Sequence, residues 1–306
     1  MNKFIFVIVL LISNITKAQI PIVSKGTMIY HEFNNSKYFP QRAIAIWLPK
    51  NYNINIKHNV IYMHDAQALF DTAISWNNET WEVDETMQQL IDNNKINSTI
   101  IVGIYNSNWH RRSEYFPKKA LLNLSKTMQD SLTKLKDKNN QFIFLGDLTA
   151  DIYLKFIVEE LKPFIDSSFS THRDASHTFM AGSSMGALIS LYGLCEYPNI
   201  FGGAACISTH WTGAANFVIP ELSEALLLYF KQHLPNPKNH KIYFDYGSVG
   251  LDSLYKVHQN KMDEIMRLKN YNNKLWITKE FMGAAHNEKA WRSRLNIPLQ
   301  FILEPQ

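Results

Sequence analysis

Short apolar runs alternate with longer segments of helical spacing along most of this chain. Short runs between turn-forming residues are typical of buried strands, and apolar residues three and four positions apart predict the inner face of a helix. Strands are therefore expected at Thr27–Phe33, Arg42–Leu48, Val60–Met63, Thr99–Ile104, His177–Ala181, Gly203–Ile207, Lys241–Tyr246 and Leu275–Phe281. Helices are expected at Trp81–Asp92, Asp151–Phe164, Ser223–His233, Asp252–Lys269 and Trp291–Leu303, and in the apolar segment between Gly186 and Pro198.

Strands that alternate with helices predict an α/β fold, with a mainly parallel central sheet and helices on both faces. The first two strands are expected to pair at an edge, with Pro40 between them. The polar, lysine-rich segment 118–140 is expected to lie over the domain rather than in its core. No linker rich in proline, glycine or serine interrupts the alternation, so residues 19–306 are predicted to form one domain.

Several polar side chains directly follow predicted strands. In a parallel sheet the carboxyl ends of the strands meet at one edge, where functional loops gather. Although these residues are distant in the sequence, we expect that edge to bring together His64, Arg111, Ser184, His210, Asp252 and His286.

The most informative of these positions is Ser184, within Gly-Ser-Ser-Met-Gly at 182–186. Gly-x-Ser-x-Gly between a strand and a helix is the pattern of a nucleophile elbow, a sharp turn that exposes the serine oxygen. The glycines lack side chains that would collide across the turn, and the helix N-terminus favours an anion at the site. The pattern also occurs in surface turns, but the acid and histidine candidates downstream favour a nucleophile.

The N-terminus differs from the rest of the chain. Lys3 precedes the unbroken apolar run Phe4–Ile12, and a polar stretch follows that ends at Ala18. This is the pattern of a secretory signal peptide, and the run is shorter than the ~20 residues that span a bilayer. We predict cleavage after residue 18 and export to the periplasm or the medium, without stable membrane insertion. A retained N-terminal anchor is the alternative.

Charge argues against nucleic acid as a partner. The formal net charge is +4, and removal of residues 1–18 takes away Lys3 and Lys17, which leaves +2. This charge is small and no basic cluster accompanies it. Nothing in the sequence predicts an oligomeric state.

Neither the cysteines nor the candidate ligands near His64 predict a metal site. Cys195 and Cys206 lie in apolar surroundings, and we expect two buried free thiols rather than a disulfide, although export permits one. His64, Asp65 and Asp71 match no known ligand spacing, so these side chains are expected to fix their loop.

Five stretches of the chain resemble one family. They are YMHDAQALFD at 62–71, VGIYN at 102–106, RRSEYFP at 111–117, AGSSMGALISLY at 181–192 and GAAHNEKAWRSRL at 283–295. They resemble the esterase-D-like ("putative esterase") family of α/β-hydrolases, which includes enterochelin, feruloyl and acetyl-xylan esterases, S-formylglutathione hydrolases and mycolyltransferases. The resemblance covers nearly all of the chain after the predicted signal peptide, and it implies an α/β-hydrolase fold.

The resemblance implies a catalytic triad. Ser184 matches the nucleophile and His286 the base. The acid is expected at Asp252, because in this family it follows a strand after a glycine-containing turn. Asp245 is the rival, but it lies within the expected strand, where it is expected to cap or hydrogen-bond the loop.

The resemblance also implies an oxyanion hole made of backbone N–H groups. Its donors are expected from Met185 and from either Ala66 or Gln67. Relatives commonly carry glycine where Ala66 stands, so its methyl group either narrows the approach of substrate or is harmless if the local backbone angles are ordinary.

Three further residues are candidates for binding substrate. His210 and Trp211 follow a predicted strand near the elbow, where Trp211 can stack on an aromatic or sugar group. The alternative, which has equal weight, is that Trp211 packs in the core and His210 is hydrogen-bonded there. Arg111, together with Arg112 and Glu114, either contacts a substrate carboxylate or sugar, or an arginine–glutamate pairing among them pins the loop.

Together these features predict an exported serine esterase that works through an acyl-enzyme and needs no metal or organic cofactor. The family suggests acylated sugars, hydroxycinnamoyl esters or siderophore esters as substrates. An acyltransferase of the same fold is one alternative, and a non-catalytic binding protein on a hydrolase scaffold is another.

Overall fold

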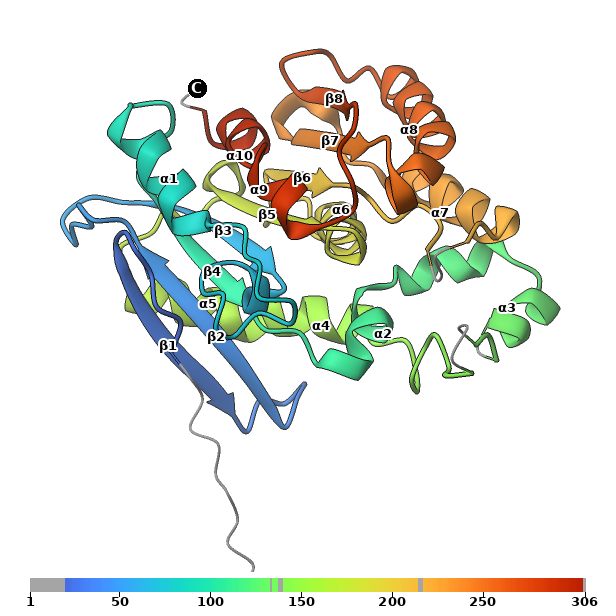
Figure 1. Ribbon diagram of the computed structural model, residues 1–306, viewed down its shortest axis with the longest axis horizontal. Coiled ribbons are helices and arrows are strands. Elements are labelled where there is room, and N and C mark those ends of the chain that lie inside the picture. The colour runs from blue at the N-terminus through green and yellow to red at the C-terminus, as the bar shows by residue number, and fades with distance from the viewer. Residues whose placement is uncertain (1–19, 133, 137–139, 214–216, 305–306) are drawn as a thin grey trace, which may run out of the picture.

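One mixed sheet organises the protein (Figure 1). The computed structural model describes residues 20–132, 134–136, 140–213 and 217–304. Within them the strand order is β1-β2-β4-β3-β5-β6-β7-β8, and β2 runs antiparallel to both β1 and β4 whereas the other neighbours are parallel. The strands are β1 (Thr27–Asn34), β2 (Gln41–Leu48), β3 (Asn59–His64), β4 (Thr99–Ile104), β5 (Thr178–Ser183), β6 (Gly203–Ile207), β7 (Lys241–Gly247) and β8 (Trp276–Phe281).

Helices cover both faces of this sheet, as the alternation predicts (Figure 1). They are α1 (Val83–Asp92), α2 (Arg111–Tyr115), α3 (Lys126–Leu132), α4 (Ala150–Phe156), α5 (Lys162–Ser168), α6 (Met185–Glu196), α7 (Pro220–His233), α8 (Lys256–Leu268), α9 (Glu288–Arg292) and α10 (Asn296–Leu303). Two short 3-10 turns matter for the site: η1 (Ala66–Ala68) after β3 and η7 (Gly250–Leu254) after β7. Of the described helices, none combines the length and the apolar character that a membrane span requires.

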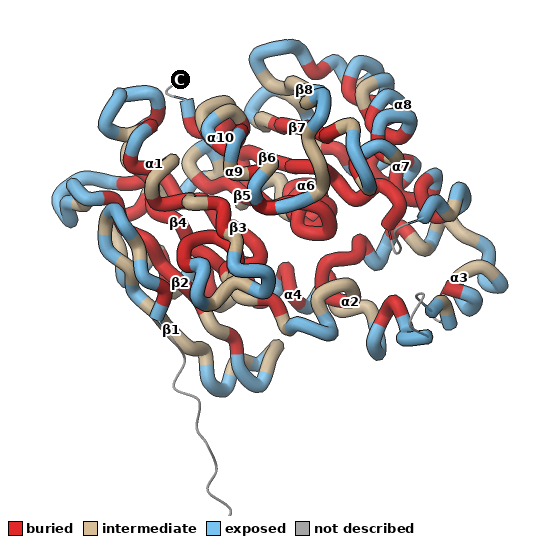
Figure 2. Tube along the Cα trace, viewed as in Figure 1, coloured by how far each residue is buried: buried red, intermediate tan, exposed pale blue. Residues whose placement is uncertain are grey.

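Successive residues of each central strand face opposite cores. Val60 and Tyr62 of β3 pack with α4 to α8, whereas Ile61 and Met63 pack with α1, α9 and α10. This follows from the period of two along a strand. Strands β3, β4, β5 and β6 are accordingly buried along their whole length, and α6 is buried up to Cys195 (Figure 2).

Most predicted elements are present, and three differ. The helix expected at Asp151–Phe164 extends to Ser168, with a π-helical turn between α4 and α5. The final helix is not continuous from Trp291, because α9 ends and α10 begins anew at Asn296. Pro298 sits in the first turn of α10, where its missing N–H costs nothing. Helix α2 lies in a stretch expected to be a loop.

The prediction for the two cysteines is confirmed. Cys195 and Cys206 are both buried free thiols, and burial raises the pKa of each. Residues 1–18, for which a signal peptide is predicted, lie outside the described residues.

Candidate active site

Ser184 occupies a strained turn between β5 and α6. Its φ of 57° and ψ of −122° lie in a region that L-residues rarely adopt, and it serves as the N-cap of α6. The turn is held in place because the N–H of Ser184 donates to the carbonyl oxygen of Ile207 at 2.9 Å. A strained serine between strand and helix is the geometry predicted for a nucleophile elbow.

The two glycines of the elbow leave room for different neighbours. A Cβ on Gly182 would lie 2.7 Å from the backbone of Gly186, so the turn closes only if Gly182 has no side chain. A Cβ on Gly186 would lie 3.3 Å from Oδ2 of Asp65 and 3.4 Å from Cβ of His64. The first turn of α6 is therefore in close contact with the loop after β3.

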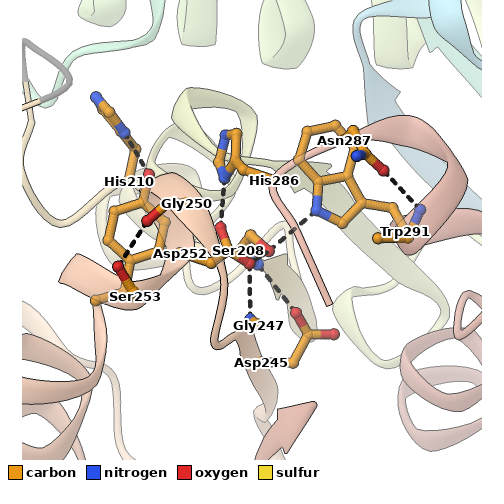
Figure 3. A network of polar contacts seen from close by, with 12 residues as sticks. Ser208, His210, Asp245, Gly247, Gly250, Asp252, Ser253, His286, Asn287 and Trp291 are labelled. Carbon is orange, nitrogen blue, oxygen red and sulfur yellow. Dashed lines mark hydrogen bonds and ion pairs between the residues drawn. The ribbon is translucent and has the colours of Figure 1, made fainter. Parts of the chain in front are cut away.

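His286 is oriented by Asp252. The imidazole Nδ1 lies 2.5 Å from Oδ1 of Asp252, which comes from η7 after β7. The other carboxylate oxygen accepts from the N–H of Gly247 at 2.7 Å and from the hydroxyl of Ser208 at 2.6 Å (Figure 3). Burial raises the pKa of Asp252, but these hydrogen bonds and the nearby His286 outweigh it and hold the pKa below its ordinary value. The carboxylate is thus charged and fixed in direction.

Asp245, the rival acid, has a different partner. Its oxygens accept from Nε and Nη2 of Arg294 at 3.1 Å and 3.0 Å, and from the N–H of Ser208 at 3.0 Å. All three residues are buried. Asp245 therefore neutralises an arginine beside the site and makes no contact of this kind with His286.

Ser208 links the two carboxylates, and sequence analysis assigned it no role. It donates to Asp252 and accepts from Nε1 of Trp291 at 3.0 Å and from Arg294 at 2.9 Å. Its φ of 45° turns the chain at the end of β6. The one signal available was its place directly after a strand that neighbours the elbow strand.

Two helix starts meet beside Ser184. Met185 is the first residue of α6, while Ala66 and Gln67 begin η1, so none of their N–H groups has an acceptor within its own helix. Asp65, the N-cap that precedes η1, has a positive φ of 62°, and Ala66 is not among the described residues with positive φ. The alanine methyl group is therefore accommodated without backbone strain, which answers the question raised by the missing glycine.

Arg111 lines the site but is paired. Its Nε and Nη2 contact the carboxylate of Asp65 at 2.7 Å and 2.6 Å, and Asn106 donates to the same carboxylate at 2.6 Å. Burial raises the pKa of Asp65, and Arg111 and Asn106 outweigh it, so the pKa stays below its ordinary value. The partner of Glu114 is Arg42, at 2.5 Å and 3.1 Å, and not Arg111. Ion pairs therefore hold the loop in place, but the pairs are Arg111 with Asp65 and Arg42 with Glu114.

Two other predicted positions lie elsewhere than in the substrate pocket. Trp211 is 1% exposed, donates to Gln259 at 2.9 Å and packs against Phe230 and Phe244, which is the core placement of the two considered for it. His210 is likewise buried, with Nδ1 2.7 Å from the hydroxyl of Tyr255.

The side chains near His64 also serve the fold. His64 Nδ1 lies 2.7 Å from the hydroxyl of Tyr153, and Asp71 accepts from the N–H groups of Ile22 and Ala73, both at 2.9 Å. Together with the Asp65–Arg111 pair, these contacts tie the loop after β3 to its neighbours, as expected.

Ser184 and His286 open into one cavity of about 410 Å³. Its wall is mostly aromatic and polar: Asp65, Ala68, Trp76, Trp81, Asn106, Asn108, Trp109, Arg111, Ser183, Ser184, His286, Glu288 and Trp291. Trp76 and Trp109 are 54% and 75% exposed, so they stand at the mouth rather than in the floor. A strained serine and an imidazole fixed by a carboxylate at one cavity, with the N–H groups of two helix starts beside the serine, are the parts of nucleophilic acyl transfer.

An eight-stranded, mostly parallel sheet with its second strand antiparallel and a serine elbow after β5 defines an α/β-hydrolase. The family model "Putative esterase" matches residues 39–138 and 146–302, so the chain belongs to that family. A Bacillus subtilis relative, the uncharacterized protein YjcH, is 24% identical over 178 residues, which is 58% of this chain and 59% of that protein. The chain thus spans less than two thirds of this relative.

Solved structures share the fold. A ferulic acid esterase superposes with a TM-score of 0.62 at 16% identity, covering 91% of this chain and 98% of that one. An IroE-like serine hydrolase from Shewanella oneidensis also gives 0.62, at 19% identity, covering 90% of this chain and 79% of that one. At these identities the similarity concerns the fold alone.

Proposed function

We propose that the protein is a serine esterase that hydrolyses carboxylic esters through an acyl-enzyme. The observation that carries the proposal is the position of Ser184 on a strained elbow in the same cavity as His286, whose ring is tied to Asp252. Membership of the esterase family supports it.

In the first step, the hydroxyl oxygen of Ser184 attacks the ester carbonyl while His286 takes its proton. Asp252 keeps Nδ1–H of the ring pointed at its carboxylate, which leaves Nε2 free as the base. The imidazolium then protonates the departing alcohol, and the acyl group remains on Ser184. In the second step, His286 takes a proton from water, which attacks the acyl-enzyme and releases the acid.

The negative charge of each tetrahedral intermediate would be held by backbone N–H groups. We assign this role to Met185 and to Ala66 or Gln67, because these residues begin α6 and η1, which meet beside Ser184. Such a donor typically contributes about 3 kcal/mol to transition-state stabilisation. All of these steps use protein groups and need no cofactor.

The charges of the cavity favour a neutral substrate. Its wall carries the carboxylates of Asp65 and Glu288 and one guanidinium, that of Arg111, which is already paired with Asp65. Glu288 is 5% exposed and accepts from Trp76 Nε1 at 3.1 Å and Asn77 Nδ2 at 2.6 Å. Since the lining has one unbalanced negative charge, strongly anionic esters such as catecholate siderophores are disfavoured.

The exposed rings at the mouth favour a flat partner. Trp76 and Trp109 can stack on a sugar or an aromatic ring, as tryptophan commonly does at the edge of a binding site. We therefore propose acylated or hydroxycinnamoylated neutral sugars as the substrate class, in preference to siderophore esters.

We further propose that the mature protein is exported. The support is the basic, apolar and small-residue pattern of residues 1–18. N-terminal sequencing of the protein from cell envelope and medium should find Gln19 first. Intact Met1 on protein that stays with the membrane would instead indicate a retained anchor.

The decisive experiment is hydrolysis of p-nitrophenyl acetate and butyrate by the protein lacking residues 1–18, compared with Ser184→Ala. We expect turnover and labelling by a fluorophosphonate probe in the natural sequence, and neither in the variant. A matched control is Ser167→Ala, because Ser167 is exposed on α5 and does not line the cavity. Failure of the natural protein to react with the probe would contradict the proposal and favour a binding protein.

Substrate class is tested separately. Methyl ferulate and acetylated xylosides are compared with a catecholate ester, with a sugar acceptor present in parallel reactions. Neutral esters should have the higher kcat/KM, and free acid should exceed transfer product. Trp109→Ala should raise KM with little change in kcat, because the ring lies away from the reacting atoms at the mouth.

A further inference from the structure

Two histidines and an aspartate lie together at the amino end of β5, at the opposite edge of the sheet from Ser184. The segment 172–177 has the spacing His-x-Asp-x-x-His, in which His172 and His177 are half-buried and Asp174 is exposed. One ligand atom from each of these three side chains lies within 4.8 Å of the other two. The six residues of β5 separate the cluster from the elbow, a distance of about 20 Å along the strand.

The three side chains already face one another. The imidazoles of His172 and His177 stack, with centroids 4.0 Å apart and an angle of 18° between their planes. Nδ1 of His177 lies 2.7 Å from Oδ1 of Asp174 and 3.0 Å from Oγ of Ser176. Within the described parts of the chain, the ring of His172 has no hydrogen-bond partner, so its nitrogens are available to a ligand.

The backbone that carries these side chains is held on both sides. The N–H of His172 donates to the carbonyl oxygen of His58 at 3.0 Å, which attaches the start of the cluster to the segment before β3. At its other end, the N–H of Gly202 donates to the carbonyl oxygen of Thr178 at 2.9 Å, and a Cβ on Gly202 would collide with the carbonyl group of Ala175. A ligand can therefore draw the side chains together by rotation about their χ angles, without the cost of ordering a loop.

Two imidazoles and a carboxylate are a donor set that suits Zn²⁺ and similar divalent transition metal ions. Zn²⁺ holds these donors at about 2.0–2.2 Å, which places tetrahedral donors about 3.3 Å apart. Nδ1 of His177 and the carboxylate of Asp174 are closer than this, and the three donors are at most 4.8 Å apart, so small rotations bring them to that spacing. The ion would replace the hydrogen that Nδ1 shares with the carboxylate, and the neutral ring of His177 would carry its hydrogen on Nε2.

We propose that His172, Asp174 and His177 form a binding site for one Zn²⁺ or a similar divalent transition metal ion, with water completing its coordination. Because the cluster directly precedes β5, the bound ion would fasten the loop between α5 and the elbow strand and stabilise the folded protein. The site lies outside the catalytic cavity and does not rest on the proposed esterase function.

The test is isothermal titration calorimetry of the mature, metal-free protein with ZnCl₂, without a histidine tag. We expect one equivalent of Zn²⁺ to bind. His172→Ala and His177→Ala should each weaken binding at least about tenfold, because loss of even an outer partner of a metal ligand typically costs 10- to 100-fold. The variant with both substitutions should lose the site. The matched control is His110→Ala, which removes an exposed imidazole in η2 (Asn108–His110) after β4 and should bind Zn²⁺ as the natural protein does.

Thermal unfolding distinguishes a lost site from a lost fold. An ion that binds only the folded state stabilises it by mass action, so Zn²⁺ at about a hundredfold excess over its Kd should raise the melting temperature by about 4 °C. We expect this rise in the natural protein and in His110→Ala, and none in the His172→Ala/His177→Ala variant. Without Zn²⁺, all of these proteins should melt within a few degrees of one another, because the substituted side chains lie outside the core.

His286 and Asp252 are the rival donors for Zn²⁺, because they also place an imidazole beside a carboxylate. His286→Ala should therefore still bind one equivalent of Zn²⁺ with unchanged affinity. Binding that is lost in His286→Ala but kept in the His172→Ala/His177→Ala variant would overturn the proposal, and so would a natural protein that binds no Zn²⁺. Either result would leave the esterase proposal standing, since that proposal is tested by fluorophosphonate labelling of Ser184.

Discussion

Two aspartates near the end of β7, Asp245 and Asp252, have different partners although their side chains are identical. Asp252 is directed at His286, whereas Asp245 is matched by the buried guanidinium of Arg294. Both carboxylates also accept a hydrogen bond from Ser208, so they belong to one hydrogen-bond network. Substitution of Asp252 should therefore lower activity, whereas substitution of Asp245 should lower stability.

For Asp252→Asn we expect kcat to fall by about 10³ to 10⁴, because an amide no longer holds the needed tautomer of His286. KM and the melting temperature should change little, since the amide fills the same space. Steady-state kinetics on p-nitrophenyl acetate provide the measurement. Retention of more than a tenth of the natural kcat would mean that Asp252 is not the triad acid.

For Asp245→Asn the loss should appear in stability. The substitution removes the nearest counter-charge of Arg294, which is 2% exposed and otherwise reaches only Oδ2 of Asp252 at 4.0 Å, and breaking a buried ion pair costs about 3–5 kcal/mol. Urea unfolding followed by circular dichroism should show this loss, while the folded fraction keeps activity within about tenfold of the natural protein. An Asp245→Asn variant that is stable but inactive would contradict this structural role.

At the scale of elements, the elbow depends on contact between β5 and the first turn of α6. Gly182→Ala places a methyl group against the backbone of Gly186, so we expect about 1–3 kcal/mol of destabilisation. Gly186→Ala gains about 1 kcal/mol of helix propensity and meets Asp65 only at 3.3 Å, so its stability should hardly change. Chemical denaturation of both variants makes the comparison, and equal losses would contradict it.

The segment before β1 is fastened to α1 by a carboxylate. Asp84 accepts from the N–H groups of Ser24 and Lys25 at 2.8 Å and 3.1 Å. Burial, together with a hydrogen bond to the adjacent Glu85, raises the pKa of Asp84 to about 6. Because this exceeds the ordinary value of about 3.9, folding takes up a proton between these pH values, and the stability that Asp84 contributes falls as pH rises through them.

Asp84→Asn removes that dependence while keeping an oxygen that accepts both N–H groups. The melting temperature of the variant relative to the natural protein should therefore rise between pH 4 and pH 6. Thermal unfolding at several pH values measures the difference. A difference that stays constant across this range would show that Asp84 titrates normally.

At the scale of the whole molecule, the sheet separates two cores, and both thiols lie in the one beneath α6 and α7. Cys206 is fully buried and Cys195 is 9% exposed. Since only exposed thiolates react with Ellman's reagent, we expect no reaction of the native protein within minutes and two equivalents after unfolding. Rapid reaction of one thiol before unfolding would indicate that this core opens locally.

Local pattern was enough for the order of elements and for the elbow. Strands such as Thr99–Ile104 and Gly203–Ile207 have the predicted bounds, because buried central strands are continuous apolar runs that end at polar residues. The break between α9 and α10 was missed because apolar residues continue at helical spacing from Trp291 to Leu303, and Pro298 marks the first turn of a new helix only once the break is seen.

The sequence by itself determined the fold class, the elbow at Ser184 and the candidates at the carboxyl edge, because these depend on periodicity and on neighbours along the chain. Only the tertiary structure decided which partner each side chain has: His286 for Asp252, Arg294 for Asp245, and the core for Trp211. Such choices depend on distances between strands that are remote in sequence. Tyr255, which follows η7, gained its place beside His210 and His286 in the same way.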